Sequence, residues 1–541
     1  MPRQHDFDTL VIGSGFGGSV AALRLAEKGH RVGVLEQGRR WSPETLPRTT
    51  WSLRRWLWMP WLGLRGFFSL RFFRHVVVLH GNAVGGGSIT YANTLLVPSA
   101  DVWQQGEWAG LLDWNAVMPA HYATARRMLG VARNARAGPA DERLHALSEA
   151  EGVGEAWALT DVGVYFGDAH EVPGTPHPDP YFQGEGPPRR SCIGCGGCMV
   201  GCRHGAKNTL DLNYLHLAER RGARVMAETR VTRIRPIDDA GGSDGAAGFL
   251  VEVREGRGLR AKRRSLSAKR VVLAASSLGT QDLLLRAKAR GDLPRLSDWL
   301  GRRVRTNAES LIGVRFPGSD IDLSQGIAIG SGVQLDADTH VEATRYPAGS
   351  DAMGLIATLM ARGRRDWLRV FIRMVLREPR ALWRALRPRG WARESMILLC
   401  MQTIDGQLEM RLGRRWTWPF RRGLQSHGPR IPTSIPRANA FARALADRFG
   451  GIALTSITEV LFDIPMTAHC IGGATMGADA QRGVCDAYGR VHGYRNLFVC
   501  DGALISANLG VNPSLTITAL AEHVMSAIPA IGTDGSDMLA G

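Results

Sequence analysis

The chain has 541 residues, is 44% apolar and carries a formal net charge of +17. This length predicts two or more lobes with a large core, and no apolar run reaches the roughly 18 uncharged residues that a membrane-spanning helix requires. The first predicted strand begins within ten residues of Met1, which leaves no room for a signal peptide and predicts a cytoplasmic location.

Residues 8–18, DTLVIGSGFGG, predict a nucleotide-binding turn between a strand and a helix. The apolar run in this segment is typical of a buried parallel strand, and residues 19–28 predict the helix. Gly13 permits a tight turn, Gly15 lets the backbone approach a pyrophosphate, and Gly18 allows the helix to pack closely on the strand. The N–H groups at the helix start favour phosphate.

A second strand, predicted over residues 31–35, ends at Glu36. An acid at this place accepts hydrogen bonds from a ribose 2′-hydroxyl and favours FAD or NAD over a 2′-phosphorylated cofactor. A lone G-x-G-x-x-G pattern also occurs in ordinary glycine turns, but here strand, turn, helix and acid stand in the order of the dinucleotide fingerprint. We therefore predict a dinucleotide-binding α/β domain.

A second glycine-rich loop, residues 80–94 (HGNAVGGGSITYANT), follows an apolar strand predicted at 76–79. Its three consecutive glycines allow the backbone to pass close to a flat or anionic group, and Ser88 can begin a helix. By itself the segment is also consistent with a flexible loop. Together with the first fingerprint it predicts a second contact with the cofactor.

The excess positive charge gathers in two regions, 51–75 and 362–393. The first combines five arginines with eight Trp and Phe residues and no acid. In the second, arginines recur every four residues and predict one helical stripe. These are Arg365, Arg369, Arg373 and Arg377. The opposite side of this helix is predicted to be apolar, formed by Leu368, Phe371, Ile372, Val375 and Leu376.

Arginine beside interfacial aromatic residues is typical of a surface that rests on anionic lipid. This interpretation predicts a peripheral position on the inner face of the cell membrane. A solvated basic helix above buried aromatic residues explains the same pattern. Nucleic acid is disfavoured as a partner, because no nucleic-acid motif is present and the apolar content is high.

Half of the eight cysteines stand in one run, Cys192-x2-Cys195-x2-Cys198-x3-Cys202. This spacing is that of a bacterial iron–sulfur segment, and basic residues would lower the thiol pKa values and balance the charge of a cluster. These residues are Arg203, His204 and Lys207. Arg203 stands where such runs have a proline, and in two-cluster ferredoxins the fourth cysteine binds the other cluster. Cys202 therefore need not bind the same metal centre as the first three cysteines. A structural zinc site and a compact cysteine-stapled loop are the alternatives. The other four cysteines are predicted to be isolated buried thiols.

The middle of the chain is predicted first to add further elements to the nucleotide-binding domain and then to form a second lobe. The elements expected first are a helix at 213–221, strands at 223–229, 231–235 and 271–275, and a helix that runs through 285. From about 300 to 465 the pattern changes to shorter alternating strands, including 311–316 and 326–329, which predicts the second lobe.

The C-terminal segment carries candidate chemistry at His469, in TAHCIGG, and Asn512, in GVNPSL. A histidine beside a glycine pair can move a proton or stabilise an oxyanion near neutral pH. Asn512 precedes a proline at the start of a helix predicted over 516–528, and its amide can bind a substrate or a cofactor edge. Taken singly, a packed histidine and an ordinary Asn-Pro turn are the alternatives.

Four segments carry a resemblance to a known family: GSGFGGSV (13–20), GNAVGGGS (81–88), the AHxxGG pattern at His469, and residues 491–522. Together they resemble the glucose–methanol–choline (GMC) flavoprotein oxidoreductases from residue 6 to about 530, and within that family the bacterial, actinobacterial-type cholesterol oxidase branch. The resemblance implies an α/β chain with a Rossmann-like FAD-binding domain in separate parts and an α+β substrate domain on an antiparallel sheet. We expect FAD-binding parts at 1–98, 191–300 and 466–541, a cap segment at 99–190 and the substrate domain at 301–465.

The resemblance also implies transfer of a hydride from a secondary alcohol carbon to the flavin, with the 3β-hydroxyl of a sterol as the expected group. His469 matches the family histidine at the substrate hydroxyl, and Asn512 matches the asparagine near flavin and substrate. Residues 339–349, THVEATRYPAG, resemble the segment with the active-site glutamate, which places the Δ5→Δ4 isomerisation of a sterol on Glu342. A surface carboxylate paired with Arg345 is the alternative for Glu342.

Matching positions imply the cofactor contacts. They are Gly13, Gly15, Phe16, Gly18, Glu36, Gly81, Gly85, Gly86, Ser88, Asn93, Val231, Asp501, Gly502, Asn512 and Pro513. In one departure from the family, Tyr91 stands where an asparagine is expected, and Asn93 follows two residues later.

The cysteine run has no counterpart in the flavin-only oxidases of this family. Two electron acceptors are therefore open: O2 in a sterol oxidase, or a protein or quinone in an iron–sulfur-relayed dehydrogenase of another hydrophobic alcohol. A non-catalytic flavin- or metal-binding protein is the third hypothesis.

Overall fold

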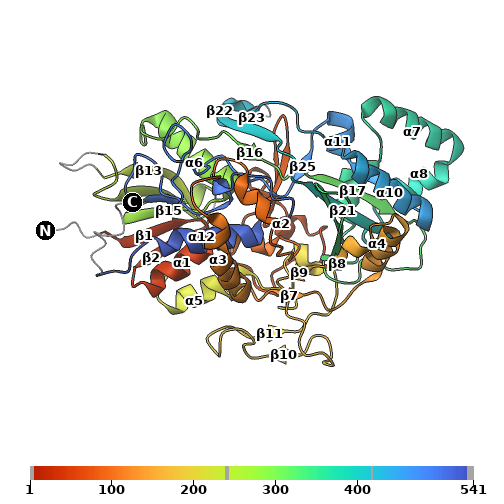
Figure 1. The fold of residues 1–541 in the computed structure, drawn as a ribbon, viewed down its shortest axis with the longest axis horizontal. Coiled ribbons are helices and arrows are strands. Elements are labelled where there is room, and N and C mark those ends of the chain that lie inside the picture. The colour runs from red at the N-terminus through yellow and green to blue at the C-terminus, as the bar shows by residue number, and fades with distance from the viewer. Residues whose placement is uncertain (1–4, 238–242, 257, 416–417, 533–541) are drawn as a thin grey trace.

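The computed structural model describes residues 5–237, 243–256, 258–415 and 418–532. Two lobes lie end to end along the long axis of the molecule (Figure 1). One lobe combines a largely parallel sheet with helices, and the other is built on an antiparallel sheet.

The α/β lobe is built on a seven-stranded sheet. Across the sheet the strands are β12 (Arg224–Met226), β2 (Val32–Leu35), β1 (Phe7–Ile12), β15 (Lys262–Leu273), β14 (Phe249–Glu255) and β13 (Thr229–Pro236), with β26 (Leu497–Val499) also beside β15. β1 runs parallel to β2 and β15, and its residues Leu10 and Val11 are fully buried. Unbroken apolar runs suit such strands, because both faces of the sheet are covered.

Four helices pack together beside this sheet. They are α1 (Phe16–Glu27), α3 (Trp114–Met128), α5 (Tyr214–Arg220) and α12 (Ser514–Ser526). α1 contacts both α5 and α12, and α12 contacts α3. Helix α6 (Ser276–Arg290) follows β15. Since β26 and α12 come from the far end of the chain, the lobe is assembled from distant segments, which confirms the bipartite fold expected from the sequence.

The second lobe contains a seven-stranded sheet in which every neighbouring pair is antiparallel. Its order is β20 (Ala357–Leu359), β24 (Ile452–Ser456), β17 (Ser310–Arg315), β21 (Ser395–Gln402), β19 (Thr339–Thr344), β18 (Ile329–Gln334) and β8 (Trp157–Leu159). Helices α4 (Pro139–Ala150) and α10 (Pro436–Phe449) pack against it with Leu144 and Phe441 in a common core. The expected antiparallel sheet is therefore confirmed.

One predicted strand of this lobe is wrong. The segment 326–329 is not extended at its start, because Gly326 has a φ of +111°, and β18 begins only at Ile329. A Cβ on Gly326 would lie 2.2 Å from the guanidinium group of Arg345. Gly326 instead forms an isolated β-bridge with Cys195.

Smaller sheets and helices complete the fold. One sheet joins β5 (Phe68–Phe72), β6 (Val77–Gly81) and β25 (Met466–Thr467), and another joins β16 (Val304–Arg305), β22 (Gln407–Arg415) and β23 (Trp418–His427). Short pairs are β3 (Trp58–Met59) with β4 (Leu64–Arg65), β7 (Ala132–Arg133) with β9 (Asp161–Val162), and β10 (Pro176–His177) with β11 (Arg189–Arg190). The remaining short helices are α2 (Leu53–Trp56), α9 (Trp391–Glu394) and α11 (Ile457–Phe462).

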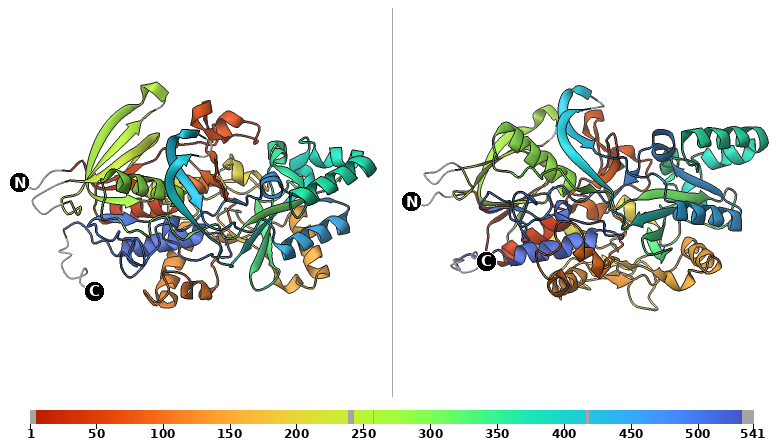
Figure 2. Two further views of the ribbon diagram at one scale, coloured as in Figure 1. Left: turned by 90° about the horizontal axis from the view of Figure 1, so that it is seen from above. Right: turned by 45° about the horizontal axis from the view of Figure 1, so that its top comes forward.

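Helices α7 (Arg364–Arg377) and α8 (Pro379–Leu386) project from the far end of the second lobe (Figures 1 and 2). No residue of α7 is buried. The apolar side predicted for this helix is divided: Phe371 packs toward α8, whereas Leu368 and Leu376 are 51% and 76% exposed. Among the described residues, no helix combines the length and apolar character needed to cross a bilayer.

Candidate active site

A cavity of about 310 Å³ is lined by residues of both lobes. Gly15 and Phe16, at the start of α1, form part of its wall on the α/β side. Strands of the antiparallel sheet contribute apolar side chains that include Ile312, Leu399 and Leu454. A cavity of this size with mostly apolar walls is suited to a large organic ligand.

The glycine turn after β1 packs too closely for a larger residue. A Cβ on Gly13 would lie 2.2 Å from the Ala274 carbonyl oxygen, and one on Gly18 would lie 2.1 Å from that of Gly13. A Cβ on Gly86 would lie 2.5 Å from the Gly15 Cα, so the two glycine-rich loops lie directly against each other. They form one backbone cradle at the N-terminus of α1.

Glu36 ties this cradle together from the end of β2. Its carboxylate accepts hydrogen bonds from the Ser14 hydroxyl at 2.7 Å and from the Gly38 N–H group at 2.7 Å. The same Ser14 hydroxyl accepts a hydrogen bond from the Gly85 N–H group of the second loop at 3.1 Å. Burial raises the pKa of Glu36 above its usual value, although these donors act in the opposite direction.

His469 lies on the cavity wall after β25 and contacts a buried acid that the sequence analysis missed. Its Nδ1 meets a carboxylate oxygen of Glu309, and the second oxygen of that carboxylate accepts a hydrogen bond from the Ala468 N–H group at 2.8 Å. Glu309 is 1% exposed. Because Nδ1 is engaged, Nε2 remains as the ring nitrogen available to a ligand. The sequence offers no signal for this pair, since Glu309 stands alone before an apolar strand.

The electrostatics of His469 follow from this pair. Burial lowers the pKa of the imidazole, but the charge of Glu309 and its hydrogen bond raise it, and Glu342 raises it further. The net pKa lies above the usual value for histidine. The imidazolium form is therefore stabilised inside a largely apolar cavity.

Asn512 lies on the cavity wall and contacts the third predicted catalytic residue. Its Nδ2 donates a hydrogen bond to Glu342 Oε2 at 3.2 Å, and Glu342 is completely buried in β19. The alternative of a surface pair with Arg345 is wrong, because Arg345 pairs with Asp141 at 2.7 Å. Asn512 Oδ1 is buried and has no hydrogen-bond partner within the protein, so it is free for a ligand in the cavity.

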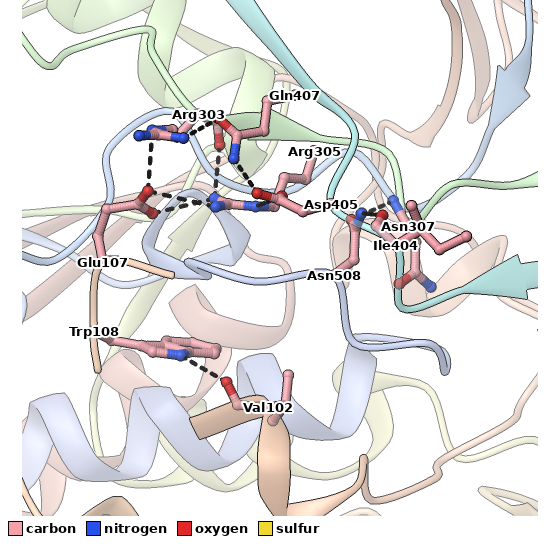
Figure 3. A network of polar contacts seen from close by, with 10 residues as sticks. All are labelled: Val102, Glu107, Trp108, Arg303, Arg305, Asn307, Ile404, Asp405, Gln407 and Asn508. Carbon is pink, nitrogen blue, oxygen red and sulfur yellow. Dashed lines mark hydrogen bonds and ion pairs between the residues drawn. The ribbon is translucent and has the colours of Figure 1, made fainter. Parts of the chain in front are cut away.

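A network of polar contacts holds the turn that precedes Asn512 (Figure 3). The Asn307 N–H group donates to Asn508 Oδ1, the Asn307 amide donates to the Val511 carbonyl oxygen, and the Gly510 N–H group donates to Asn307 Oδ1, each at 3.0 Å. Asn307 precedes Glu309 by two residues. One loop therefore positions both the partner of His469 and the turn that carries Asn512.

The same loop is anchored by a buried arginine (Figure 3). The Arg305 side chain is 1% exposed and pairs with Glu107 at 3.2 Å and with Asp405 at 2.9 Å. Arg303 pairs with Glu107 from another side at 3.1 Å. These ion pairs join the segment before α3, the start of the second lobe and the loop before β22.

Several residues that match family cofactor contacts support loops instead of lining the cavity. The Ser88 hydroxyl donates to the Gly85 carbonyl oxygen at 2.6 Å. Asn93 is fully buried with a φ of +76° and lies against the Cys198 thiol. Val231 is buried in β13. The predicted residues on the cavity wall are Gly15, Phe16, Gly81, Asp501, Gly502, Asn512 and Pro513, and Tyr91 lies there as well.

The four clustered cysteines do not support the predicted metal site in its simplest form. They are Cys192, Cys195, Cys198 and Cys202, all free thiols. Within the described part of the chain, no group of three or more His, Cys, Asp or Glu side chains could hold a metal ion. The four thiols are therefore not arranged around a single metal ion.

Models of known families match three parts of the chain. A GMC oxidoreductase model matches residues 188–298, a second one matches residues 455–521, and a model of an NAD(P)-binding Rossmann-like domain matches residues 11–48. The chain is 52% identical over 531 residues to the cholesterol oxidase of Acinetobacter baumannii, which covers 98% of this chain and 95% of that protein. The chain belongs to the GMC oxidoreductases.

Further relatives of this GMC oxidoreductase agree. The cholesterol oxidase of Mycobacterium tuberculosis is 46% identical over 539 residues, which cover 97% of this chain and 91% of that protein. The crystal structure of pyridoxine 4-oxidase from Mesorbium loti has the same fold, with a TM-score of 0.59, 15% identity and coverage of 96% of this chain and 98% of that chain. The chain is thus an FAD-dependent oxidoreductase that acts on CH–OH groups.

The residues of this GMC oxidoreductase fit FAD. The cradle of Gly15 and Gly86 leaves backbone in place of side chains at the start of α1, where a pyrophosphate is favoured. Asp501, at the end of β26, lies on the cavity wall with its pKa raised to about 6 by burial. Asn512, whose Oδ1 has no hydrogen-bond partner within the protein, lies on the wall of the same cavity.

Proposed function

We propose that this GMC oxidoreductase oxidises the 3β-hydroxyl of a sterol and moves the Δ5 double bond to Δ4. The observation that carries the proposal is one apolar cavity with His469 and Asn512 on its wall beside the glycine cradle. A sterol is a rigid apolar body with a single hydroxyl, so it matches such a cavity. Two relatives at 46–52% identity that bear the name cholesterol oxidase support this substrate class.

The backbone cradle would hold the pyrophosphate of FAD, Glu36 the ribose, and the start of α12 at Ser514 the edge of the flavin ring. Bound FAD supplies the hydride acceptor for the alcohol carbon. The N–H groups at the start of α12 favour negative charge, which suits a reduced flavin. The apolar walls exclude water from the reacting groups.

His469 would receive the hydroxyl proton at Nε2, directly or through one water. Glu309 fixes the ring through Nδ1 and stabilises the positive charge that the imidazole acquires, as a carboxylate does for a catalytic histidine. The second Nδ2 hydrogen of Asn512 would donate to the hydroxyl oxygen and orient it. Positioned acid–base groups of this kind contribute about 10²- to 10⁴-fold to a rate.

Glu342 would carry out the isomerisation. Its carboxylate takes a proton from C4 of the keto-steroid and returns it at C6, so the double bond moves without a net change in protons. Asn512 holds this carboxylate by its hydrogen bond. His340 Nε2 lies 3.6 Å from the second carboxylate oxygen.

We further propose that the enzyme draws its substrate from an anionic membrane surface on the cytoplasmic side. Leu454 and Ala357 line the cavity and also pack in the cluster that seats α7 and α8. The exposed arginines and apolar residues of α7 therefore lie close to the substrate cavity. O2 is the expected acceptor by analogy with relatives named as oxidases.

The test is anaerobic mixing of the flavin-loaded enzyme with cholesterol, its 3α-epimer or a long-chain primary alcohol, followed by the visible flavin absorbance. Cholesterol should bleach the flavin and the other two should not. In His469→Gln, cholesterol should bleach the flavin about 10²- to 10⁴-fold more slowly with FAD still bound. In Glu342→Gln, cholesterol should still bleach the flavin, but the steroid product should lack the conjugated enone. Bleaching by the primary alcohol alone would instead favour a dehydrogenase of another hydrophobic alcohol.

A further inference from the structure

The four clustered cysteines surround a second, small cavity away from the substrate. Cys192, Cys195, Cys198 and Cys202 all line it. Cys192 lies close enough to the other three thiols to be affected by their charges, and Cys195 lies that close to Cys198 and Cys202. Four thiols from a segment of eleven residues thus face one space, which is the arrangement that a metal–thiolate centre requires.

Backbone N–H groups are directed at the sulfur atoms. The Gly194 N–H group donates to Cys192 Sγ at 3.4 Å, and the Ala328 N–H group of the second lobe donates to Cys198 Sγ at 3.4 Å. Hydrogen bonds to sulfur tune the potentials of iron–sulfur clusters. Such donors favour sulfur atoms that carry negative charge.

A buried cation stands beside the thiols. Lys207 is 1% exposed, and its ammonium group donates to the backbone carbonyl oxygens of Cys198 at 2.8 Å and Ile89 at 3.0 Å. The groups whose negative charge would stabilise it most are the thiols of Cys198 and Cys202, ahead of Asp211. A buried ammonium is costly unless an opposite charge is nearby, and thiolates held by a metal centre supply that charge.

A buried amide points to the same place. Asn93 is fully buried and lies against Cys198, and neither its Nδ2 nor its Oδ1 has a hydrogen-bond partner that satisfies normal geometry. Buried side-chain amides are nearly always paired. The Asn93 amide is therefore left to serve a group that the protein alone does not supply.

From these contacts we infer that the four cysteines hold an iron–sulfur cluster. A single zinc ion is disfavoured, because no three of the described His, Cys, Asp or Glu side chains could hold one ion. In a cluster each thiolate binds a different iron atom, so the sulfur atoms stand farther apart around a shared centre.

The cluster site adjoins the flavin cavity through a single layer of side chains. The Lys207 ammonium lies 4.6 Å from the ring centre of Tyr91, and Tyr91 lines the flavin cavity. Met199, next to Cys198 in the chain, lines the flavin cavity as well. The site is thus placed as an electron relay between the flavin and the protein surface, where Cys195 is exposed.

This relay rests on the proposed alcohol oxidation and gives the electrons an exit other than O2, at the surface near Cys195. Oxidation of the alcohol to the ketone releases two electrons and two protons. The cluster would take the electrons one at a time and pass them to an acceptor at the surface; a quinone that receives both would become the quinol with two protons from solvent. Electrons that leave by this route reduce no oxygen.

The first test needs no variant. Enzyme prepared without oxygen should contain about four iron and four acid-labile sulfide atoms per chain, with a paramagnetic signal after reduction by dithionite. Flavin without iron, or zinc in place of iron, would overturn the cluster. Because this assay uses no alcohol, it decides the cluster even if sterols fail to bleach the flavin.

The relay is tested with Cys195→Ala, matched by Cys400→Ala at a buried thiol in β21. Cys195→Ala should lose the iron, keep FAD and bleach with sterol within about twofold of the parent rate, but reduce a water-soluble benzoquinone at least tenfold more slowly. Cys400→Ala should match the parent in iron, FAD and quinone reduction. Full iron in Cys195→Ala would overturn the assignment of that ligand, and undiminished quinone reduction after loss of iron would overturn the relay.

Discussion

At the scale of single residues, the chemistry depends on two buried contacts that reach across the chain. Glu309 meets His469, and Glu342 accepts a hydrogen bond from Asn512. Each carboxylate is at most 1% exposed. A buried carboxylate is stable only when it is paired or hydrogen-bonded, so each pair is held in place by the cost of separating it.

Glu309→Gln removes the charge that raises the pKa of His469. We expect kcat/KM for the sterol to fall about 10- to 100-fold. Since the pKa of the imidazole then drops, the acid limb of the pH profile should move to lower pH. The measurement is kcat/KM against pH, with flavin content as the check on folding.

The matched control is Glu459→Gln. Burial raises the pKa of Glu459 to about 8, so its side chain is largely neutral near pH 7 and resembles glutamine in charge. It accepts hydrogen bonds from Ser310 and Thr455, not from His469. An equal shift of the acid limb in both variants would contradict a specific role for Glu309.

At the scale of elements, the loop between β16 and β17 organises the site. Asn307 ties it to the turn before Asn512, and Arg305 anchors it to Glu107 and Asp405 (Figure 3). The loop can make these contacts because Asn307 adopts a φ of +58°, which asparagine tolerates better than most residues.

Arg305→Met leaves Glu107 and Asp405 without their buried partner. Removal of one member of a buried ion pair costs about 3–5 kcal/mol, and the exposed Asp405 reduces this cost, so we expect about 2–4 kcal/mol. The Arg303 side chain is 40% exposed, so Arg303→Met should lower the free energy of unfolding by less than about 1 kcal/mol. Denaturant unfolding of the two variants measures the difference, and equal losses would contradict the anchoring role.

At the scale of the whole molecule, residues of both lobes line one cavity. The antiparallel sheet forms the apolar wall of this cavity, and the projecting helix α7 lies at the edge of that sheet (Figure 2). Exposed apolar side chains on α7 alternate with arginines. In the proposed docking on a bilayer, α7 would bring this wall of the cavity close to the lipid.

Replacement of both Arg369 and Arg373 by glutamate should weaken binding to vesicles with anionic lipid by at least about tenfold. Each basic residue near such a surface contributes about 1 kcal/mol to binding. The loss should be larger at low salt. The same change at Arg263 and Arg264, exposed on β15 of the other lobe, is the control. Vesicle cosedimentation gives the answer, and binding that is equal in both double variants would contradict docking through α7.

Features that depend on neighbours along the chain could be predicted from the amino-acid sequence. Gly13, Gly15 and Gly18 specify a turn whose contacts span a few residues, so their spacing was sufficient to predict the β1–α1 unit. Alternating and continuous apolar runs likewise predicted the two kinds of sheet. The match over residues 491–522 pointed to the family because a long segment preserves many such local choices.

Contacts between residues far apart in the chain could not be predicted in this way. Glu342 and Asn512 are 170 positions apart, and no local pattern marks Glu309 as the partner of His469. The same applies to α7, where helical spacing predicted an apolar side but not which of its residues, such as Phe371, would turn toward α8. Pairing across the chain is set by how the two lobes pack, and that packing is a property of the whole fold.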